Sequence, residues 1–348
     1  MTGASRVSVV IVTYDSAGAV AESLPALLRE LAPGDELIVV DNASRDGTAQ
    51  RVRELAPAAR LLAQRDNLGF AAGCNVGAAA ASGELLVFLN PDAVVEPGWG
   101  EAIRRPLADG RGLGAWMGLV LAERGTVVNT SGGVVHFSGV AWAGQAGAPL
   151  GAAPRRPREV AFASGACLAV PRAEWERLGG FPEDYFMYCE DVELSLRVWL
   201  WGGRVGVEPA ARADHDYAFG KGELKWRLLE RNRWATILRV YPGALLALLT
   251  PALIATELAL LAVAHASGWG AAKRAADADV LRALPRLLRE RRAIQARRAI
   301  SSAEFARLLT PDLDSPYLGA AGRSALLRAG LRGYWAAVLA LLRLPRGS

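Results

Sequence analysis

The stretch VSVVIVTYDS, residues 7–16, decides the fold class. Its first seven residues are almost all β-branched, without alternation of apolar and polar positions. A continuous run of this kind is typical of a strand that is buried on both faces of a parallel sheet. Polar residues follow at the point where the strand ends, namely Thr13, Tyr14 and Asp15. The stretch therefore predicts the first strand of an α/β fold.

The segments that follow alternate between helix and strand. Their patterns predict a helix over about 19–31, a strand at 36–40, a helix capped by Asp46 that ends near 55, a short strand at 61–62, a glycine-rich turn over 67–75, an alanine-rich helix over 76–81 and a strand at 85–89. Strands that alternate with helices in this order are joined by right-handed crossovers. We therefore expect an open, mostly parallel sheet.

Acidic residues follow three of these strands. Asp15 follows the first strand, Asp41 the second, and Asp92 the strand at 85–89. Any one of them is explained by a turn or a helix cap. Open α/β sheets, however, bind ligands at the carboxyl ends of their strands, and a nucleotide with a cation would use several such residues. Three acids at one edge favour a ligand site.

Composition restricts the class of protein. The chain has 348 residues, 52% of them hydrophobic, and a net charge of +5, which favours contact with an anionic partner such as a membrane face or phosphates. Nucleic acid is the rival anionic partner, but no helix-turn-helix, zinc-ligand or aromatic RNA-binding signature supports it, so we expect none. Three cysteines fit neither a disulfide framework nor a zinc site, and the first residues lack a signal-peptide pattern. We expect a cytoplasmic setting.

A pair of adjacent acids, Glu190 and Asp191, stands in the stretch YFMYCEDVELSLRVWLWG, residues 185–202. The pair precedes a helical pattern with Val192, Leu196 and Trp199 on one side. Negative charge at a helix N-terminus is stabilising in itself. Stability and chemistry therefore both explain the pair at this point.

Four motifs together resemble glycosyltransferase family 2, particularly its bacterial rhamnosyltransferase-like members: VSVVIVTYDS, VVDNASRDGT, NLGFAAGCNVGAAAASGELLVFLNPDAVVEPGW and SGACLAVPRAEWERLGGFPEDYFMYCEDVELSLRVWLWGG. The likeness spans about residues 5–235. It implies the GT-A fold, a Rossmann-like, mostly parallel mixed sheet with helices on both faces. It also implies a catalytic domain over 1–240, with a nucleotide-binding half at 1–95 and an acceptor half at 96–240. A helical region at 241–348 would follow.

The resemblance assigns residues to the nucleotide and its sugar. Those expected against the nucleotide are Thr13, Tyr14, Asp15, Asp41, Asn67, Gly69 and Asn75. The last three match a loop that closes over the nucleoside, although a plain turn into a helix explains its glycines equally well. Gly165 lies where the family brings a loop near the donor sugar or the acceptor.

Asn90-Pro91-Asp92 occupies the place of the family's DxD motif, which holds Mg²⁺ or Mn²⁺ on the diphosphate. Asn90 replaces the first acid, so Asp92 would supply the carboxylate contact to the cation. His215 stands at the interval where many family members have a metal-binding histidine. Both a metal-ligand role and a structural role stay open for it.

The resemblance also implies the base of the reaction. Asp191 would take the proton of the acceptor hydroxyl from the side opposite the departing diphosphate, and Glu190 would orient the acceptor or a neighbouring backbone group. ERNRW at 230–234 is similar to the QxxRW motif of processive synthases. Arg231 or Arg233 would then grip the diphosphate, unless both are part of the basic face of an amphipathic helix.

The carboxyl-terminal region is apolar and basic. Residues 243–265 are long enough to span a bilayer, but they include Pro251 and Glu257, so a span, a re-entrant or interfacial helix and a buried helix pair all stay open. An arginine-dense helix at 281–300 and an apolar helix at 324–343 follow. We favour attachment to the inner face of the cell membrane without a span. Residues 141–159 predict a mobile loop.

The sequence thus predicts an inverting, metal-dependent glycosyltransferase of cell-envelope glycan synthesis. Its donor would be a dTDP-, UDP- or GDP-sugar, with dTDP-rhamnose the first to test, and its acceptor a lipid-linked sugar or a polysaccharide. A processive synthase is disfavoured because such proteins usually have several membrane spans. A nucleotide-binding membrane scaffold without catalysis stays open. A dinucleotide oxidoreductase is excluded because no GxGxxG follows the first strand.

Overall fold

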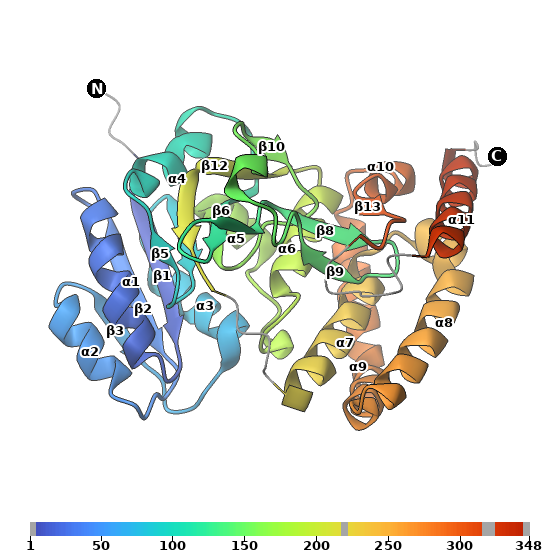
Figure 1. Ribbon diagram of the computed structural model, residues 1–348, viewed down its shortest axis with the longest axis horizontal. Helices are drawn as coiled ribbons and strands as arrows, with labels where there is room; N and C mark the ends of the chain where they lie inside the picture. The colour runs from blue at the N-terminus through green and yellow to red at the C-terminus, as the bar shows by residue number, and fades with distance from the viewer. Residues whose placement is uncertain (1–4, 217–221, 315–323, 344–348) are drawn as a thin grey trace. The chain divides into compact units, whose positions relative to one another are not determined.

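A computed structural model describes residues 5–216, 222–314 and 324–343 (Figure 1). The chain forms two compact units. The first comprises Met1–Gly133, Ala143–Val198 and Gly203–Tyr217, and the second Val134–Trp142, Trp199–Gly202 and Ala218–Ser348. This division differs from a boundary at residue 240, because helix α7 (Gly222–Val240) packs along α9 (Gly270–Ala296) of the second unit.

A mixed, mostly parallel sheet forms the centre of the first unit. Its strand order is β10-β12-β6-β11-β4-β1-β2-β3, with β5 paired to β12 and β7 to β6. The strands are β1 (Val7–Thr13), β2 (Glu36–Asp41), β3 (Arg60–Ala63), β4 (Leu85–Leu89), β5 (Val94–Val95), β6 (Ala115–Ala122), β7 (Val127–Thr130), β10 (Arg158–Glu159), β11 (Cys167–Pro171) and β12 (Val205–Asp214). Strands β1 to β4 run parallel, and β11 is antiparallel to both its neighbours.

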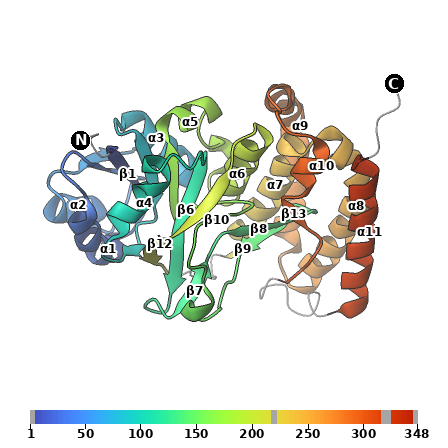
Figure 2. The same cartoon turned by 90° about the horizontal axis from the view of Figure 1, so that it is seen from above.

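The first strand is buried along its whole length, as its apolar run predicts. Helices cover both faces of the sheet: α1 (Ala17–Glu30), α2 (Thr48–Leu55), α3 (Gly69–Ala80), α4 (Trp99–Ala108), α5 (Arg172–Leu178) and α6 (Glu190–Leu200). Figure 2 shows α3, α5 and α6 on one side of the sheet and α1 and α4 on the other. The predicted α/β fold is confirmed.

Helix α3 begins seven residues earlier than the predicted start at 76, so the expected turn over 67–75 was largely wrong. Gly73 and Gly77, which indicated a turn, lie inside the helix and face β1. A Cβ atom on Gly73 would lie 2.7 Å from Val12 Cγ1, and one on Gly77 would overlap Val10. These glycines serve close packing between helix and sheet and not a reversal of the chain.

Aromatic side chains pack together in the core of the first unit. The ring centroids of Phe88 and Trp175 are 4.5 Å apart, and Trp175 contacts Phe181 edge-on at 5.0 Å. Tyr185 is completely buried in the short 3₁₀ helix Glu183–Tyr185 that precedes α6. These aromatic residues are core, and they anchor the segment that leads into the Glu190-Asp191 pair.

The segment 141–159, expected as an irregular loop, contains short regular elements. They are β9 (Ala141–Ala143), a 3₁₀ helix at Leu150–Ala152 and β10. Two backbone hydrogen bonds tie the segment to β7 and to the residue before it, with Gly147 N–H donating to the Val128 carbonyl and Leu150 N–H to the Thr126 carbonyl. Glycine and proline content was therefore a poor guide to its structure.

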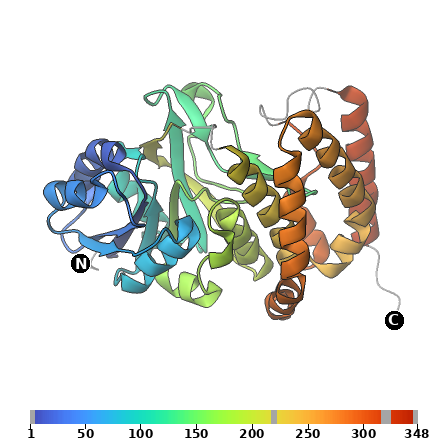
Figure 3. The same cartoon turned by 90° about the horizontal axis from the view of Figure 1, so that it is seen from below.

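The second unit consists of helices and a small sheet. The helices are α7, α8 (Gly243–Ala266), α9, α10 (Ser302–Ala306) and α11 (Ala325–Arg343), and the sheet has the order β13-β8-β9, with β8 at Gly133–His136 and β13 at Leu309–Thr310. Figure 3 shows α7, α8 and α9 as long helices, and α8 packs on both α9 and α11. The continuous α8 excludes a helix pair within 243–265.

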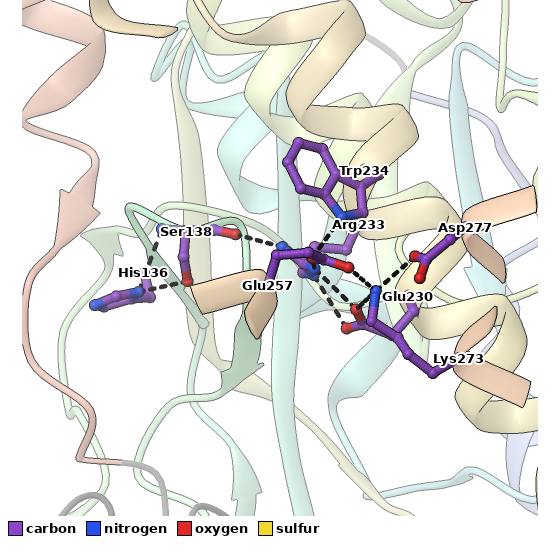
Figure 4. Close-up of polar contacts among 8 residues, drawn as sticks. All are labelled: His136, Ser138, Glu230, Arg233, Trp234, Glu257, Lys273 and Asp277. Carbon is purple, nitrogen blue, oxygen red and sulfur yellow. Dashed lines mark hydrogen bonds and ion pairs between the residues drawn. The ribbon is translucent and has the colours of Figure 1, made fainter. Parts of the chain in front are cut away.

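Two helices of the described residues, α8 and α11, are long and apolar enough to cross a membrane by length and composition. The apolar pattern of α8 is interrupted by Glu257, whose environment is polar. Its carboxylate accepts hydrogen bonds from Arg233 Nη2 at 2.8 Å and Trp234 Nε1 at 2.9 Å, and it contacts Lys273 Nζ (Figure 4). Glu257 therefore joins α8 to α7 and α9.

Three further acid contacts complete what we call the charge cluster, formed by Glu230, Arg233, Glu257, Lys273 and Asp277 (Figure 4). Arg233 pairs with Glu230 at 2.8 Å, and Lys273 Nζ lies 3.1 Å from Glu230 and 2.6 Å from Asp277. The Lys273 side chain is completely buried. Buried charges are tolerated when each has a partner, and this condition is met here.

Candidate active site

The pairing of β5 with β12 brings Asp92 and His215 together. Val94 pairs with Asp214 in an antiparallel register, so the residues that precede β5 lie beside those that follow β12. Asp92 Oδ1 is 3.1 Å from His215 Nε2, and Asn90 Nδ2 is also 3.1 Å from that nitrogen. The structure therefore brings His215 to Asn90 and Asp92, which lie more than a hundred positions earlier in the chain.

The backbone of His215 is fixed by two hydrogen bonds, which hold its imidazole in position. The His215 backbone N–H donates to the Leu121 carbonyl at 2.8 Å, and the His215 backbone carbonyl accepts from Asn129 Nδ2 at 2.7 Å. His215 is buried, whereas the Asp92 side chain is half exposed. A nitrogen and a carboxylate oxygen at this separation suit a divalent cation of the Mn²⁺ type.

The donor set of this pair is small. The described residues contain no group of three or more His, Cys, Asp or Glu side chains that would enclose a metal. Such an open arrangement fits a cation that takes its remaining ligands from water and from the phosphates of a substrate, as Mg²⁺ and Mn²⁺ do in nucleotide sites.

Asp191 lies at the first turn of α6, and its carboxylate is held by backbone N–H groups. Oδ2 accepts from Gly165 at 2.9 Å and Oδ1 from Val192 at 2.8 Å. Gly165 precedes β11, whose neighbour Ala166 accepts from the Asn90 N–H at 3.1 Å. Asp191 is thereby brought to the same edge of the sheet as the Asn90-Pro91-Asp92 segment.

The two acids of the pair differ in environment. Burial raises the pKa of Glu190 well above its usual range, and the neighbouring Asp191 raises it further. Burial also raises the pKa of Asp191, while the N–H groups of Gly165 and Val192 lower it. Glu190 Oε2 is buried and has no hydrogen-bond partner among the described residues.

The backbone that leads into the pair is strained. Phe186, Tyr188 and Cys189 have φ angles of 63°, 70° and 65°, in the left-handed region that costs a residue other than glycine roughly 1–3 kcal/mol. The Phe186 carbonyl accepts from the Ala71 N–H of α3 at 3.1 Å, which holds this segment in place. Strain of this kind is concentrated at functional sites.

The expected nucleotide residues gather at the carboxyl ends of β1 and β2. Asp41 is buried and accepts from Thr13 Oγ1 at 2.9 Å and from Ser44 Oγ at 2.5 Å. Asp15 Oδ1 accepts from the Arg45 N–H at 2.7 Å, while the Tyr14 side chain is 51% exposed. Tyr14 is thus available to stack on a ligand, and Asp41 is fixed in position.

The residues expected to form a loop over the nucleoside have two different positions: Asn67 and Gly69 lie at the start of α3, and Asn75 lies within it. Asn67 Oδ1 accepts from the Gly69 N–H at 2.9 Å at the start of α3. Gly69 has φ of 81°, and a Cβ atom there would lie 2.5 Å from the Phe186 ring. Asn75 binds both backbone groups of Phe181, at 3.0 Å each, so its amide joins α3 to the segment before α6.

Arg231 and Arg233 belong to the second unit. Arg231 Nε donates to Asn232 Oδ1 at 2.9 Å. Arg233 has a side chain only 3% exposed, within the charge cluster, and it also donates to the Ser138 carbonyl at 3.0 Å. Arg233 therefore serves the packing of this unit, which excludes the alternative that it grips a diphosphate; for Arg231 that role stays a prediction.

The sequence analysis did not predict several residues that hydrogen-bond the candidate site residues and hold them in position. Ser44 binds Asp41, Asn129 holds His215, and Asn42 donates to the Gly69 carbonyl at 3.0 Å. Ser44 and Asn42 adjoin Asp41 in VVDNAS, so their position after a strand was an available signal. No local pattern marks Asn129, because only the pairing of β6 and β7 brings it to His215.

Comparison with known proteins identifies the chain's relatives. The family model "Glycosyl transferase family 2" matches residues 8–145. An N-acetylglucosaminyl-diphospho-decaprenol L-rhamnosyltransferase of Mycobacterium tuberculosis is 29% identical over 62% of this chain and 77% of its own. Rhamnosyltransferase WbbL of Escherichia coli is 33% identical over 23% of this chain and 33% of its own.

Two solved structures share the fold. GalNAc-T7 with UDP, GalNAc and Mn²⁺ aligns with a TM-score of 0.58 over 71% of this chain and 51% of its own, at 16% identity. A mannosyltransferase of Pyrobaculum calidifontis with GDP-Man and Mn²⁺ aligns with a TM-score of 0.50 over 97% and 87%, at 22% identity. The match to glycosyltransferase family 2 covers residues 8–145, and the solved structures show the GT-A fold. The chain is thus a glycosyltransferase of this fold, with rhamnosyltransferases among its relatives.

Proposed function

We propose that the protein is an inverting, metal-dependent sugar transferase that acts on a lipid-linked or polysaccharide acceptor at the inner face of the cell membrane. The observation that carries the proposal is the edge of the sheet at which Asp191 and the Asp92–His215 pair meet through the contacts of Gly165, Ala166 and Asn90. A base and a site for an anionic leaving group are both needed there.

In this proposal the chain's residues act on opposite sides of one sugar. Asp191 accepts the proton of the acceptor hydroxyl as its oxygen forms a bond to the anomeric carbon. The bond from that carbon to the donor phosphate breaks, and its electron pair leaves with the nucleoside diphosphate. Asp92 and His215 would hold Mg²⁺ or Mn²⁺, which neutralises charge on the diphosphate when bound.

Nucleotide binding is assigned to the edge formed by β1 and β2. Tyr14 is exposed enough to lie against the base, and Asp41 is held by Thr13 and Ser44 in a fixed orientation for a base or ribose. Asp15, Asn67, Gly69, Asn75 and Asn90 line or shape the same edge. Among the chain's relatives, the names of two rhamnosyltransferases support dTDP-rhamnose as the first donor to test.

Membrane attachment is supported by the exposed face of α8. We call the apolar face of α8 the side chains of Ile254 and Leu258, four residues apart on one side of the helix and 57% and 64% exposed. Exposed arginines of α9, including Arg282, Arg289 and Arg292, would meet anionic headgroups. The M. tuberculosis relative is named for a decaprenol-linked substrate, which supports a lipid-linked acceptor here.

The substitution Asp191→Asn tests the proposal. We expect sugar transfer to fall by roughly 10²–10⁴-fold or more because the amide cannot take a proton. Donor binding, measured as the thermal shift with Mn²⁺ and nucleotide sugars, is expected to change little. Asp109→Asn at the exposed end of α4 is the control and should keep full activity. Transfer by Asp191→Asn at the wild-type rate would remove Asp191 from the base role.

Products and partial activities separate the other functions. A polymer of many sugars, in place of single additions, would identify a processive synthase. Binding of donor with Mn²⁺ without transfer to any lipid-linked or polysaccharide acceptor would favour a nucleotide-binding scaffold.

A further inference from the structure

Glu190 is a buried acid that the proposed reaction does not use. The residue is 5% exposed, and its Oε2 atom has no hydrogen-bond partner among the described residues. The groups that act on its charge are Asp191 and its own backbone N–H, and none of them is a cation. An ionised carboxylate in such a place would cost several kcal/mol, because the side chain is buried and its Oε2 atom accepts no hydrogen bond among the described residues.

Asp191 lies beside Glu190, and burial raises its pKa as well, but its carboxylate has hydrogen-bond donors that Glu190 Oε2 lacks. Two backbone N–H groups donate to its carboxylate, from Gly165 at 2.9 Å and Val192 at 2.8 Å. It also occupies the first turn of α6, where the helix dipole favours negative charge. When two adjacent carboxyl groups share one charge, the charge resides on the group with the better donors.

We propose that Glu190 holds a proton at neutral pH and is a positioning residue, which leaves Asp191 as the single charged carboxyl group of the pair. For its catalytic meaning this inference rests on the proposed base role of Asp191. A neutral Glu190 places no second negative charge beside Asp191. Such a charge would raise the pKa of Asp191 and favour its protonated form, which cannot act as a base.

Among the described residues, a further titratable group that interacts with Glu190 is the thiol of Cys74 in α3. Burial raises the pKa of that thiol well above its usual range, and Glu190 raises it further, so Cys74 is neutral as well. Among the described groups that act on Glu190, one is the Asp191 carboxylate and one the neutral Cys74 thiol, and neither is a cation that would favour loss of the Glu190 proton.

Infrared difference spectroscopy of the full chain tests the proposal without any ligand. At neutral pH, the wild-type protein should have the carbonyl band of a protonated carboxylic acid that shifts in D₂O. The band should disappear in Glu190→Gln and persist in Asp191→Asn. Its absence from the wild type, its survival in Glu190→Gln or its loss in Asp191→Asn would overturn the proposal.

A second measurement follows the titration of Asp191. In protein with ¹³C-labelled carboxyl groups, the Asp191 midpoint should move by less than about half a pH unit in Glu190→Gln, because one neutral group replaces another. A drop of about one unit or more would mean that Glu190 carries charge in the native protein. If Glu190→Gln does not fold, a wild-type Glu resonance still protonated at neutral pH decides the question.

These outcomes are independent of the transfer assay. Wild-type activity of Asp191→Asn would contradict the base role and leave the protonated Glu190 standing. A charged Glu190 would contradict this inference and leave the base role of Asp191 intact.

Discussion

His215 shows how a single residue acquires a role from strand pairing. Its imidazole reaches Asp92 because β12 pairs with β5, and Asn129 and Leu121 fix its backbone on both sides. A surface histidine would have neither the burial nor the two backbone contacts. The structural role and the ligand role are therefore compatible, since the same contacts that bury His215 also aim it at Asp92.

The substitution His215→Ala should weaken binding of a nucleoside diphosphate only when a divalent cation is present. We expect roughly tenfold weaker binding with Mn²⁺, about 1.4 kcal/mol, because one of two protein ligands is lost. Titration calorimetry of UDP, with Mn²⁺ and then with EDTA, measures the difference. The matched control Asn129→Ala removes a support and not a ligand. Equal loss in the presence of EDTA would assign His215 to packing alone.

Glu190→Gln has a separate consequence for stability. Because the native pKa of Glu190 lies above its value of 4.5 in an unfolded chain, the native state binds the extra proton between these two pH values. Wild-type stability therefore falls as pH rises through that window, by up to about 1.4 kcal/mol per unit, and the variant lacks this loss. Urea unfolding at several pH values measures the difference in free energy of unfolding between the wild type and Glu190→Gln, which should change steadily from acid toward neutral pH as the wild type loses stability. A constant difference would contradict the raised pKa.

At the scale of elements, α3 is the helix on which the site depends. It packs on β1 through its glycines, binds the segment before α6 through Asn75 and Ala71, and begins at Gly69 beside Phe186. The edge proposed for the nucleotide and the proposed base, Asp191, are thus connected by one helix. A shift of α3 would move both.

Gly77→Ala should destabilise the protein, because the added methyl group overlaps Val10 of β1. Overpacking of this kind typically costs about 1–3 kcal/mol. The control is Gly18→Ala in α1, where a Cβ atom meets nothing within 4 Å and helix propensity predicts a gain of up to about 1 kcal/mol. Urea midpoints of the two variants compare them directly. A stable Gly77→Ala protein would mean that α3 can move away from the sheet at little cost.

The elements differ in how far the sequence predicted them. Apolar runs predicted β1, β2 and β4, because their residues are buried on both faces and nothing else explains such runs. The start of α3 was missed, since glycine at a close contact and glycine at a turn look the same in one sequence. The Asp191 contact with Gly165 was missed too, because a residue supplying only its backbone N–H leaves no pattern in its side chain.

The candidate site was also predicted in part, where local sequence patterns are enough, and missed where residues meet only through tertiary contacts. Acids at strand ends were predicted to share an edge, since parallel strands end together, and they do. The supporting residues Ser44 and Asn129 depend on contacts that local patterns do not carry. Arg233 was a candidate for the diphosphate by motif, but its burial among Glu230 and Glu257 depends on the packing of α7, α8 and α9.

At the scale of the whole molecule, the chain combines a polar transferase site in one unit with exposed apolar helices in the other. The charge cluster makes this combination possible within the second unit, because it binds α8 to α7 and α9 through polar contacts and leaves Ile254 and Leu258 outward. An acid inside an apolar helix thus indicates a helix that is held on one side and exposed on the other.

Leu258→Glu should reduce binding to lipid vesicles while the fold is retained, because Leu258 is 64% exposed and makes no core. Placing a charge at the apolar boundary of a bilayer costs roughly 2–3 kcal/mol, so binding should fall about 30–150-fold. Flotation of the full chain with phosphatidylserine-containing vesicles measures it. Leu28→Glu, at an exposed site of α1 in the first unit, is the control and should float like the wild type. If Leu258→Glu also floats unchanged, the apolar face of α8 does not contact lipid, and another surface or a protein partner must cover it.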